Sequence, residues 1–310
     1  MSLRRSLCYS TIPQKASWIC ATPVELEAAV AVLDEIHPPL FHHDYDGNIY
    51  ELGSIGPHNV VICSTASTVV DYLRFNFPEI KACLWVGIAS GMPSRTTDIR
   101  LGDVVVSTPN ESSPGVIQLD RGKTVADGGF ARTAVLRGPS QTLLTAVDTL
   151  RALHTQHNGP IISVLSELQA QGPKKWMPPP AVDELFDSTY EHVEGGGNCA
   201  NCDRTKLVPR GLRNGTSPVI HYGLVVSGNQ VVRHGGTRDM LQKELGALCF
   251  GIGDAGLIND TQCLVIRGIC DYADSHKNRA WQSFAAATAA AYAKELLSFV
   301  PPSIGDIEPV

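Results

Sequence analysis

Two aspartates follow the most apolar segment of the chain, in the run RGICDYAD that contains Asp271 and Asp274. A carboxyl group at the end of a buried strand is partly desolvated, which raises its pKa and suits it to donate a proton. We therefore expect Asp271 to act as a general acid. An aspartate at such a position can also simply cap the turn that follows, and we expect Asp274 to have that structural role.

Glu25 is the second acidic candidate, in the run ATPVELEAA. Pro23 opens a predicted helix that extends to about Ile36, and the positive end of a helix dipole stabilises a glutamate in the first turn. Helix stabilisation is therefore one explanation for Glu25, and contact with a ligand beyond the preceding strand is the other. Glu27 lies on the opposite side of the helix and is expected to face solvent.

Two glycine-containing segments are candidates for binding polar groups. Gly87–Gly91 (GIASG) follows an apolar strand, and we expect a turn whose backbone N–H groups cradle an anion, with Ser90 and Gly91 as contacts. The segment SGNQ begins with Ser227, Gly228 and Asn229. An amide side chain offers a donor and an acceptor to the edge of a heterocycle, although it stabilises a turn equally well.

Eight of the nine cysteines fall into two groups that bear on metal binding and redox state. Cys199 and Cys202 form a CxxC in a glycine-rich loop, but no second pair stands at a suitable spacing, so we expect no metal site there. Six others lie in apolar, strand-like runs, which predicts reduced, buried thiols and a cytoplasmic protein. These are Cys20, Cys63, Cys83, Cys249, Cys263 and Cys270.

Composition excludes several classes of protein. The 310 residues are 43% hydrophobic and 18% charged, with a formal net charge of -6, which fits a folded domain and argues against a nucleic-acid or anionic-membrane partner. No apolar run reaches the roughly 18–20 residues that cross a bilayer, and no secretory signal is visible at the N-terminus. We expect a small-molecule substrate as the partner.

Strand-like and helix-like segments alternate along the chain, which predicts one α/β domain with a central mixed sheet flanked by helices. We place this domain at 17–300, with a Gly-, Pro- and Cys-containing insertion near 169–217, and expect flexible ends at 1–16 and 301–310. Ligands of such folds bind where strand ends open into loops. That rule selects the loops after Ala21, Ile88, Ser227 and Ile269.

Those loops carry a resemblance to a known family. The runs WICATPVELEAA, WVGIASGMPS, HYGLVVSGNQVV and CLVIRGICDYADSHKN resemble, in this order, the purine and uridine phosphorylase and nucleosidase superfamily, and most closely its fungal branch. The resemblance implies cleavage of the N-glycosidic bond of a purine-type nucleoside by phosphate or water. It matches Asp271 to the acid that protonates the leaving base and Glu25 to the glutamate that activates water. It also implies a homo-oligomer and no cofactor apart from phosphate as a co-substrate.

The chain departs from that family in the sugar and phosphate half of the site. Relatives read close to CFEMEAAG where this chain reads CFGIGDAG, so Gly251 and Gly253 replace two glutamates, one of which binds the ribose hydroxyls. Asp254 can replace the glutamate that binds the ribose hydroxyls only if the backbone shifts by one residue. Ala89 and Ser90 replace glycines of the phosphate turn, which disfavours phosphate, and the loop after Cys63 is shortened.

Three hypotheses remain open on this evidence. The first is a nucleoside phosphorylase or hydrolase with a divergent site. The second is a repurposed enzyme of secondary metabolism that uses Asp271 for an acid-assisted cyclisation, elimination or rearrangement of a small molecule without ribose. The third is a ligand-sensing module without catalysis.

Overall fold

The computed structural model describes residues 16–39, 46–64, 69–120, 122–124, 130–132, 137–156, 161–172, 174–193, 199–213, 215, 217–252 and 261–302. Of the two ends predicted to be flexible, only residues 16, 301 and 302 fall within these ranges.

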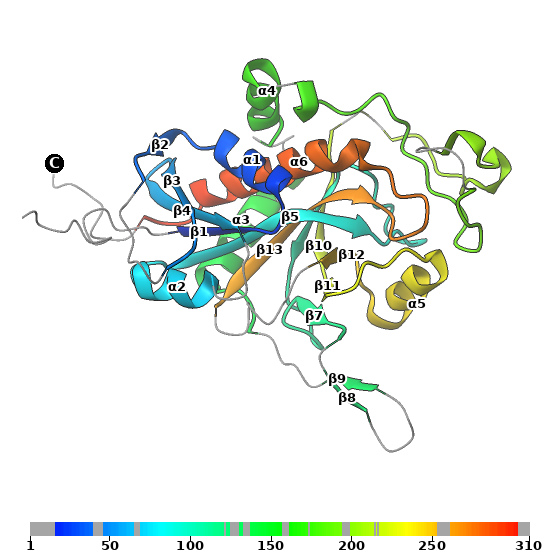
Figure 1. Ribbon diagram of the computed structural model, residues 1–310, viewed down its shortest axis with the longest axis horizontal. Helices are drawn as coiled ribbons and strands as arrows, with labels where there is room; N and C mark the ends of the chain where they lie inside the picture. The colour runs from blue at the N-terminus through cyan, green and yellow to red at the C-terminus, as the bar shows by residue number, and fades with distance from the viewer. Residues whose placement is uncertain are drawn as a thin grey trace, which may run out of the picture.

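Eleven strands in the described part of the chain form one mixed sheet. They are β1 (Ala16–Cys20), β2 (Glu35–His37), β3 (Tyr50–Ile55), β4 (His58–Ser64), β5 (Ala82–Gly91), β6 (Val104–Ser107), β7 (Val116–Gln118), β10 (Ile220–Gly223), β11 (Val225–Gly228), β12 (Cys249–Ile252) and β13 (Cys263–Asp271). The main order is β10-β6-β13-β5-β1-β4-β3-β2, and β12 branches from β5 as an antiparallel partner that continues into β11 and β7. A separate hairpin of β8 (Gly122–Thr124) and β9 (Phe130–Arg132) projects from the body of the protein (Figure 1).

Six α-helices surround the sheet in the described residues. They are α1 (Pro23–Ala31), α2 (Val69–Asn76), α3 (Gln141–Gln156), α4 (Ile161–Gln171), α5 (Gly235–Leu245) and α6 (Gln282–Ser298). Side chains of α1, α3, α4 and α6 share one apolar cluster with one face of the sheet, whereas α2 packs on the other face through Leu73 and Phe77. This arrangement confirms the predicted single α/β domain with a mixed sheet. No helix in these ranges is both long enough and apolar enough to span a membrane.

Helix α6 approaches the sheet unusually closely, as its alanine-rich sequence predicts. Every alanine in it is buried, and the backbone oxygen of Ala285 lies 1.8 Å from the position that a Cβ on Gly268 would occupy. Small residues on the helix and a glycine on β13 therefore bring the two backbones together.

The end of the first helix differs from the prediction. Helix α1 ends at Ala31, and Glu35–His37 form strand β2, which pairs with β3. A Cβ at Gly53 would lie 2.4 Å from the backbone oxygen of Glu35, so the glycine allows the two strands to approach. Long-range pairing overrides the local helical pattern here. Helix α4 was not predicted at all.

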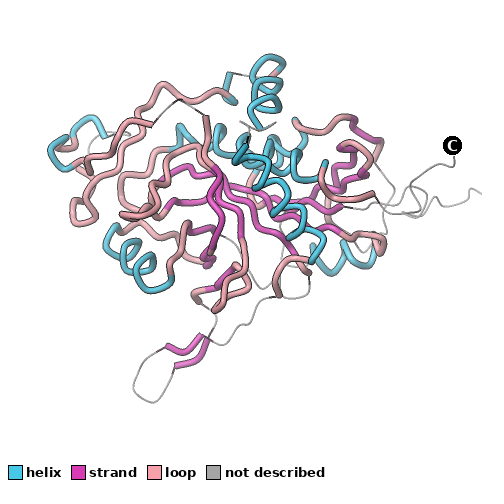
Figure 2. Tube along the Cα trace, turned by 180° about the vertical axis from the view of Figure 1, so that it is seen from behind, coloured by secondary structure: helices cyan, strands magenta, loops and turns pink. Residues whose placement is uncertain are grey.

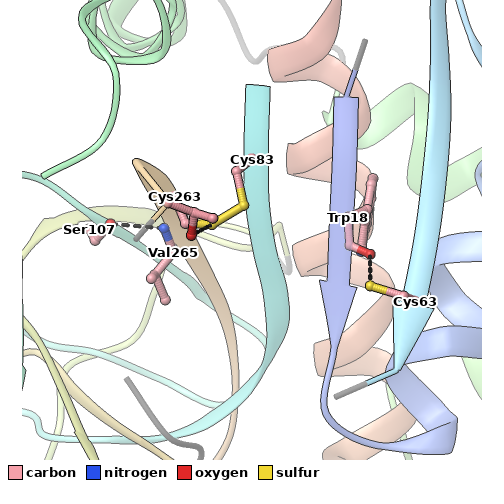
Figure 3. Close-up of a disulfide and its surroundings, with 7 residues drawn as sticks. Trp18, Cys63, Cys83, Ser107, Cys263 and Val265 are labelled. Carbon is pink, nitrogen blue, oxygen red and sulfur yellow. Dashed lines mark hydrogen bonds between the residues drawn. A yellow bond between two sulfur atoms is a disulfide. The ribbon is translucent and has the colours of Figure 1, made fainter. Parts of the chain in front are cut away.

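Cys83 and Cys263 contradict the prediction of reduced thiols, because a disulfide joins them (Figure 3). They are register partners on the adjacent parallel strands β5 and β13, with Cα atoms 4.5 Å apart. The pairing register of two strands separated by 180 residues could not be read from the sequence. The other four core cysteines, Cys20, Cys63, Cys249 and Cys270, are free and buried as predicted.

The segment from Lys174 to Ser217 crosses the end of the sheet toward which β5 and β13 point, and its loops gather there in Figure 2. Buried charges attach it to the core. Arg213 forms a two-pronged ion pair with Asp103, at 2.5 and 2.7 Å. Arg210 donates to the Tyr272 hydroxyl at 2.9 Å and pairs with Asp183 at 2.8 Å. The segment is thus fixed beside the residues that follow β13.

Candidate functional site

Glu25 is buried, with 4% of its surface exposed, and three backbone N–H groups donate hydrogen bonds to its carboxylate. Its Oε2 accepts hydrogen bonds from the N–H groups of Ala21 (2.6 Å) and Thr22 (2.9 Å), which closes the capping box of α1. Its Oε1 accepts one from Ile88 at 2.7 Å. Two carboxylate oxygens offer about four acceptor positions, so one remains for a further donor. Glu25 therefore both caps its helix and presents a carboxylate at β5.

The expected anion-binding turn at Gly87–Gly91 is wrong. These residues form the second half of β5, and none of them has a positive φ. The ladders of β13 and β12 impose strand geometry on a segment whose glycines and serine resemble a turn. The Ile88 N–H is occupied by Glu25 instead of an anion. Ser90 and Gly91 are both buried in this strand.

Asp271 lies at the end of β13, beside Ser90 of β5, after an irregularity between Ile269 and Asp271. Its side chain is 11% exposed. Oδ1 accepts a hydrogen bond from the Ala273 N–H at 3.0 Å, and Ala273 has a left-handed φ of 55°. This tight turn holds the carboxyl group in a fixed orientation.

Lys277 connects the two predicted site residues Asp271 and Ser90. Its ammonium lies 3.3 Å from Asp271 Oδ2 and donates to Ser90 Oγ at 3.4 Å. Sequence reasoning missed Lys277, although it is the first basic residue after the candidate acid. Lys277 thus joins the carboxyl group of Asp271 on β13 to the hydroxyl of Ser90 on β5.

A buried arginine, Arg267, was also missed. It lies on β13 with 1% of its surface exposed, and its guanidinium packs 4.4 Å from the centre of the Trp85 ring. Arg267 Nη1 lies 2.5 Å from the position that a Cβ on Gly87 would occupy, and Glu25 Oε1 lies 2.4 Å from the same position. Burial lowers the pKa of Arg267, and the charge of Glu25 opposes this. The sequence signal was a single arginine inside the apolar run CLVIRGI.

Gly251 is the one substituted position of CFGIGDAG that the structure describes with its surroundings. A Cβ there would lie 3.2 Å from Arg267 Nε. Nε and Nη1 of Arg267 are both buried without a hydrogen-bond partner. A glycine at this position therefore offers no side chain to Nε of the guanidinium. Gly253 and Asp254 lie outside the described residues.

The remaining predicted contacts are divided between the core and the surface. Ser227 and Gly228 are buried on β11, and Ser227 is the register partner of Gly251. Asn229 is exposed, and its backbone N–H donates to Asp120 at 2.9 Å. Ser227 thus belongs to the same sheet region as Arg267, whereas the Asn229 side chain faces outward.

A cavity of about 390 Å³ opens beside Asp271 and is closed on its other side by the 174–217 segment. Asp274 also borders it, is 5% exposed, and lies 3.3 Å from Arg238 of α5. Burial raises the pKa of Asp274. Its other contacts are structural, since its Oδ1 accepts the His276 N–H at 3.0 Å.

No protein-family model matches the chain. A nucleotide-binding leucine-rich repeat (NLR)-like protein of Hyaloscypha variabilis is 42% identical over 304 residues, covering 94% of this chain. The chain spans about 30% of the length of that relative.

Solved structures of low sequence identity share the fold. A Helicobacter pylori MTAN variant with 5′-methylthioadenosine in its active site has a TM-score of 0.59 at 14% identity, covering 93% of this chain and 99% of that one. Futalosine hydrolase of Helicobacter pylori has a TM-score of 0.55 at 15% identity, covering 92% and 97%. A 5′-methylthioadenosine/S-adenosylhomocysteine nucleosidase from Borrelia burgdorferi, described as putative and bound to adenine, has a TM-score of 0.58 at 16% identity, covering 91% and 99%. These structural neighbours belong to the superfamily that the sequence motifs resemble.

Proposed function

We propose that this chain hydrolyses the N-glycosidic bond of a nucleoside, with Asp271 as the proton donor to the leaving base and Glu25 as the group that orients water. One observation carries the proposal: two carboxylates flank the end of β5. Glu25 bonds to the N–H of Ile88, and Asp271 is the register partner of Ser90. Ile88 and Ser90 are two residues apart on a strand, a rise of about 6.6 Å, which is suitable for a scissile bond between the carboxylates.

The two groups have complementary tasks in this reaction. Asp271 gives its proton to a ring nitrogen of the base as the C–N bond breaks, and the charge that develops on the sugar attracts water. The water oxygen bonds to the sugar carbon and one water proton passes to Glu25. Solvent then takes that proton from Glu25 and returns one to Asp271, which restores both groups. The buried guanidinium of Arg267 lies beside Glu25 in this arrangement.

Water is favoured over phosphate as the nucleophile. The Ile88 N–H that would face an anion already bonds to Glu25, and the segment around it is strand instead of an open turn. The hydrolases and nucleosidases among the structural neighbours support the same class of reaction. Those solved with adenine or 5′-methylthioadenosine support a purine-type base.

The test is release of free base from adenosine, inosine, guanosine, uridine and 5′-methylthioadenosine, measured by chromatography with and without phosphate. We expect release from a purine nucleoside without phosphate, and a loss of at least about 100-fold in Asp271→Asn, which has no proton to donate. An unchanged rate in Asp271→Asn would remove the acid from the mechanism. Survival of all five nucleosides would overturn the proposal and favour a substrate without ribose.

A second candidate, a ligand-sensing module, is favoured by the NLR-like relative and by the absence of a carboxylate at Gly251. A module of this kind binds a purine compound without turning it over. Thermal unfolding with each nucleoside distinguishes the two, because a ligand at 100 times its dissociation constant stabilises the fold by about 2.7 kcal/mol. Stabilisation without base release supports sensing, whereas stabilisation with release supports hydrolysis.

A further inference from the structure

Three side chains of the 174–217 segment converge on one point outside the site described above. One ligand atom from each of His192, Cys199 and Cys202 lies within 4.8 Å of the other two. An imidazole nitrogen and two sulfurs are the donors that Zn²⁺ selects over the hard cations, which prefer oxygen. The sequence interpretation found no metal site because it sought a second cysteine pair, whereas the third donor is a single histidine seven residues before Cys199.

The backbone around these side chains is already ordered into a ligand loop. Cys199–Asn201 form a 3₁₀ turn, in which the Cys202 N–H bonds to the Cys199 oxygen at 3.2 Å. The Asp203 N–H donates to the Tyr190 hydroxyl at 2.8 Å, which links the CxxC to the loop just before His192. The His192 N–H donates to Ser275 Oγ at 2.9 Å. The donors are therefore placed by the fold and not by chance proximity of free loops.

A fourth donor lies beside the group. The His276 side chain is 3% exposed, and neither of its ring nitrogens has a hydrogen-bond partner among the residues that the structure describes. Its ring meets that of His192 edge-on, with centroids 5.5 Å apart, and stacks on Phe186 at 4.1 Å. Buried polar nitrogens without partners are costly, and a metal ion would satisfy one of them. The nearest carboxylate to its Nδ1 is Asp274, at 3.8 Å, which is suited to orient a metal-bound imidazole.

We propose that His192, Cys199 and Cys202 bind a zinc ion, with His276 as the fourth ligand. Bonds of about 2.3 Å to sulfur and 2.0–2.1 Å to nitrogen in a tetrahedron place the donors roughly 3.5–3.8 Å apart. The ligand atoms of His192, Cys199 and Cys202 now lie within 4.8 Å of one another, so shifts of about 1 Å bring these three to that spacing. Both thiols lose their protons when the ion binds.

The ion would join two parts of the chain that border the cavity. His192 and the two cysteines belong to the 174–217 segment, whereas His276 belongs to the loop that follows Asp271. Cys199 and His276 both line the cavity beside Asp271. Zinc would therefore fix the wall of that cavity. The proposal does not rest on the proposed hydrolysis, because metal content is measured without turnover.

The experiment measures zinc in the full-length chain. The protein is purified without chelators, reduced, equilibrated with zinc, separated from free metal, and analysed by mass spectrometry of the metal. We expect one zinc per chain. Cys199→Ser/Cys202→Ser should retain none, whereas Cys63→Ala, which removes a buried thiol elsewhere, should retain one. Absence of zinc from the reduced wild-type chain, or zinc retained by the double serine variant, would overturn the site.

Two further measurements test the ligands separately. The first needs no variant, so it remains valid if the double serine variant fails to fold, and the second tests His276. Cobalt substitution of the wild-type chain should give the charge-transfer absorption of thiolate ligands, and its absence contradicts the cysteine ligands. His276→Gln should weaken zinc affinity by more than about 10-fold, since even outer-shell changes commonly cost about 10- to 100-fold. An unchanged affinity would exclude His276 from the ligand set. A Cys199–Cys202 disulfide that reforms in the presence of excess zinc would show a redox pair instead of a metal site.

Discussion

The Arg267 guanidinium faces Gly251 across the strands β13 and β12, with Nε 3.2 Å from the position of a Cβ on that glycine. Gly251 supplies no carboxylate to this buried arginine, and Arg267 Nε and Nη1 have no hydrogen-bond partner among the described residues. The positive charge of Arg267 is met instead by the nearby Glu25 and by the face of the Trp85 ring.

The first prediction concerns that charge. Gly251→Glu supplies a carboxylate to Arg267, whereas Gly251→Met adds a side chain of similar length without charge. Both must displace Arg267 by a few tenths of an ångström, so the steric cost is shared. We expect the Glu variant to be more stable than the Met variant by about 1.5–3 kcal/mol, the range for a hydrogen bond to a charged group. Urea unfolding of both variants measures the difference, and equal stabilities would show that Arg267 does not face position 251.

The second prediction separates two glutamates of the same helix. Glu25→Gln replaces a carboxylate that accepts three backbone hydrogen bonds with an amide whose NH₂ group meets a backbone N–H. We expect a loss of about 1.5–3 kcal/mol in the free energy of unfolding. Glu27→Gln is the matched control, because Glu27 is half-exposed and pairs only with the exposed Lys175, and it should change stability by less than about 1 kcal/mol. Similar effects of the two changes would contradict the structural role of Glu25.

The third prediction concerns pH and the attachment of the 174–217 segment. Burial opposes ionisation of Asp103, but hydrogen bonds from His221 and Arg213 outweigh it and hold the pKa of Asp103 below its ordinary value. Because the pKa of Asp103 is lower in the folded than in the unfolded protein, its ionised form stabilises the fold at every pH above the unfolded pKa of about 4. This contribution to the free energy of unfolding is lost as the pH falls through the pKa of the folded protein. Asp103→Asn should therefore cost about 3 kcal/mol near neutral pH and progressively less below about pH 4.

Urea unfolding of wild type and Asp103→Asn, from neutral pH to below about pH 4, measures whether the difference in their free energies of unfolding shrinks as the pH falls. Asp98→Asn is the control, since Asp98 is about half-exposed while it pairs with Arg100 at 2.7 Å and with Arg210 at 3.6 Å. Its effect should stay below about 1 kcal/mol at every pH. A difference between wild type and Asp103→Asn that is constant from neutral to acid pH would exclude Asp103 as the titrating group.

Local patterns in the sequence predicted the elements that position the site better than they predicted its contacts. The apolar run ending at Asp271 and the alanine-rich helix α6 were predicted because each is long and has one clear periodicity. The Gly87–Gly91 turn was wrong because neighbouring strands decide its conformation. Arg267, Lys277 and His192 were missed for a related reason. Their partners lie on segments far away in the chain, so only the folded arrangement shows what each one faces.

The last prediction tests the close contact between α6 and the strand that carries Asp271. A Cβ on Gly268 would lie 1.8 Å from the backbone oxygen of Ala285, and a backbone atom in a helix packed on a sheet cannot rotate away. Gly268→Ala must separate α6 from β13 or distort the strand three residues before Asp271, so we expect a loss of more than about 3 kcal/mol in unfolding free energy. Gly211→Ala is the matched control, because no atom lies within 4 Å of its added Cβ, and its effect should be within about 0.5 kcal/mol. Thermal and urea unfolding compare the two, and a Gly268→Ala protein as stable as Gly211→Ala would contradict the close packing of α6.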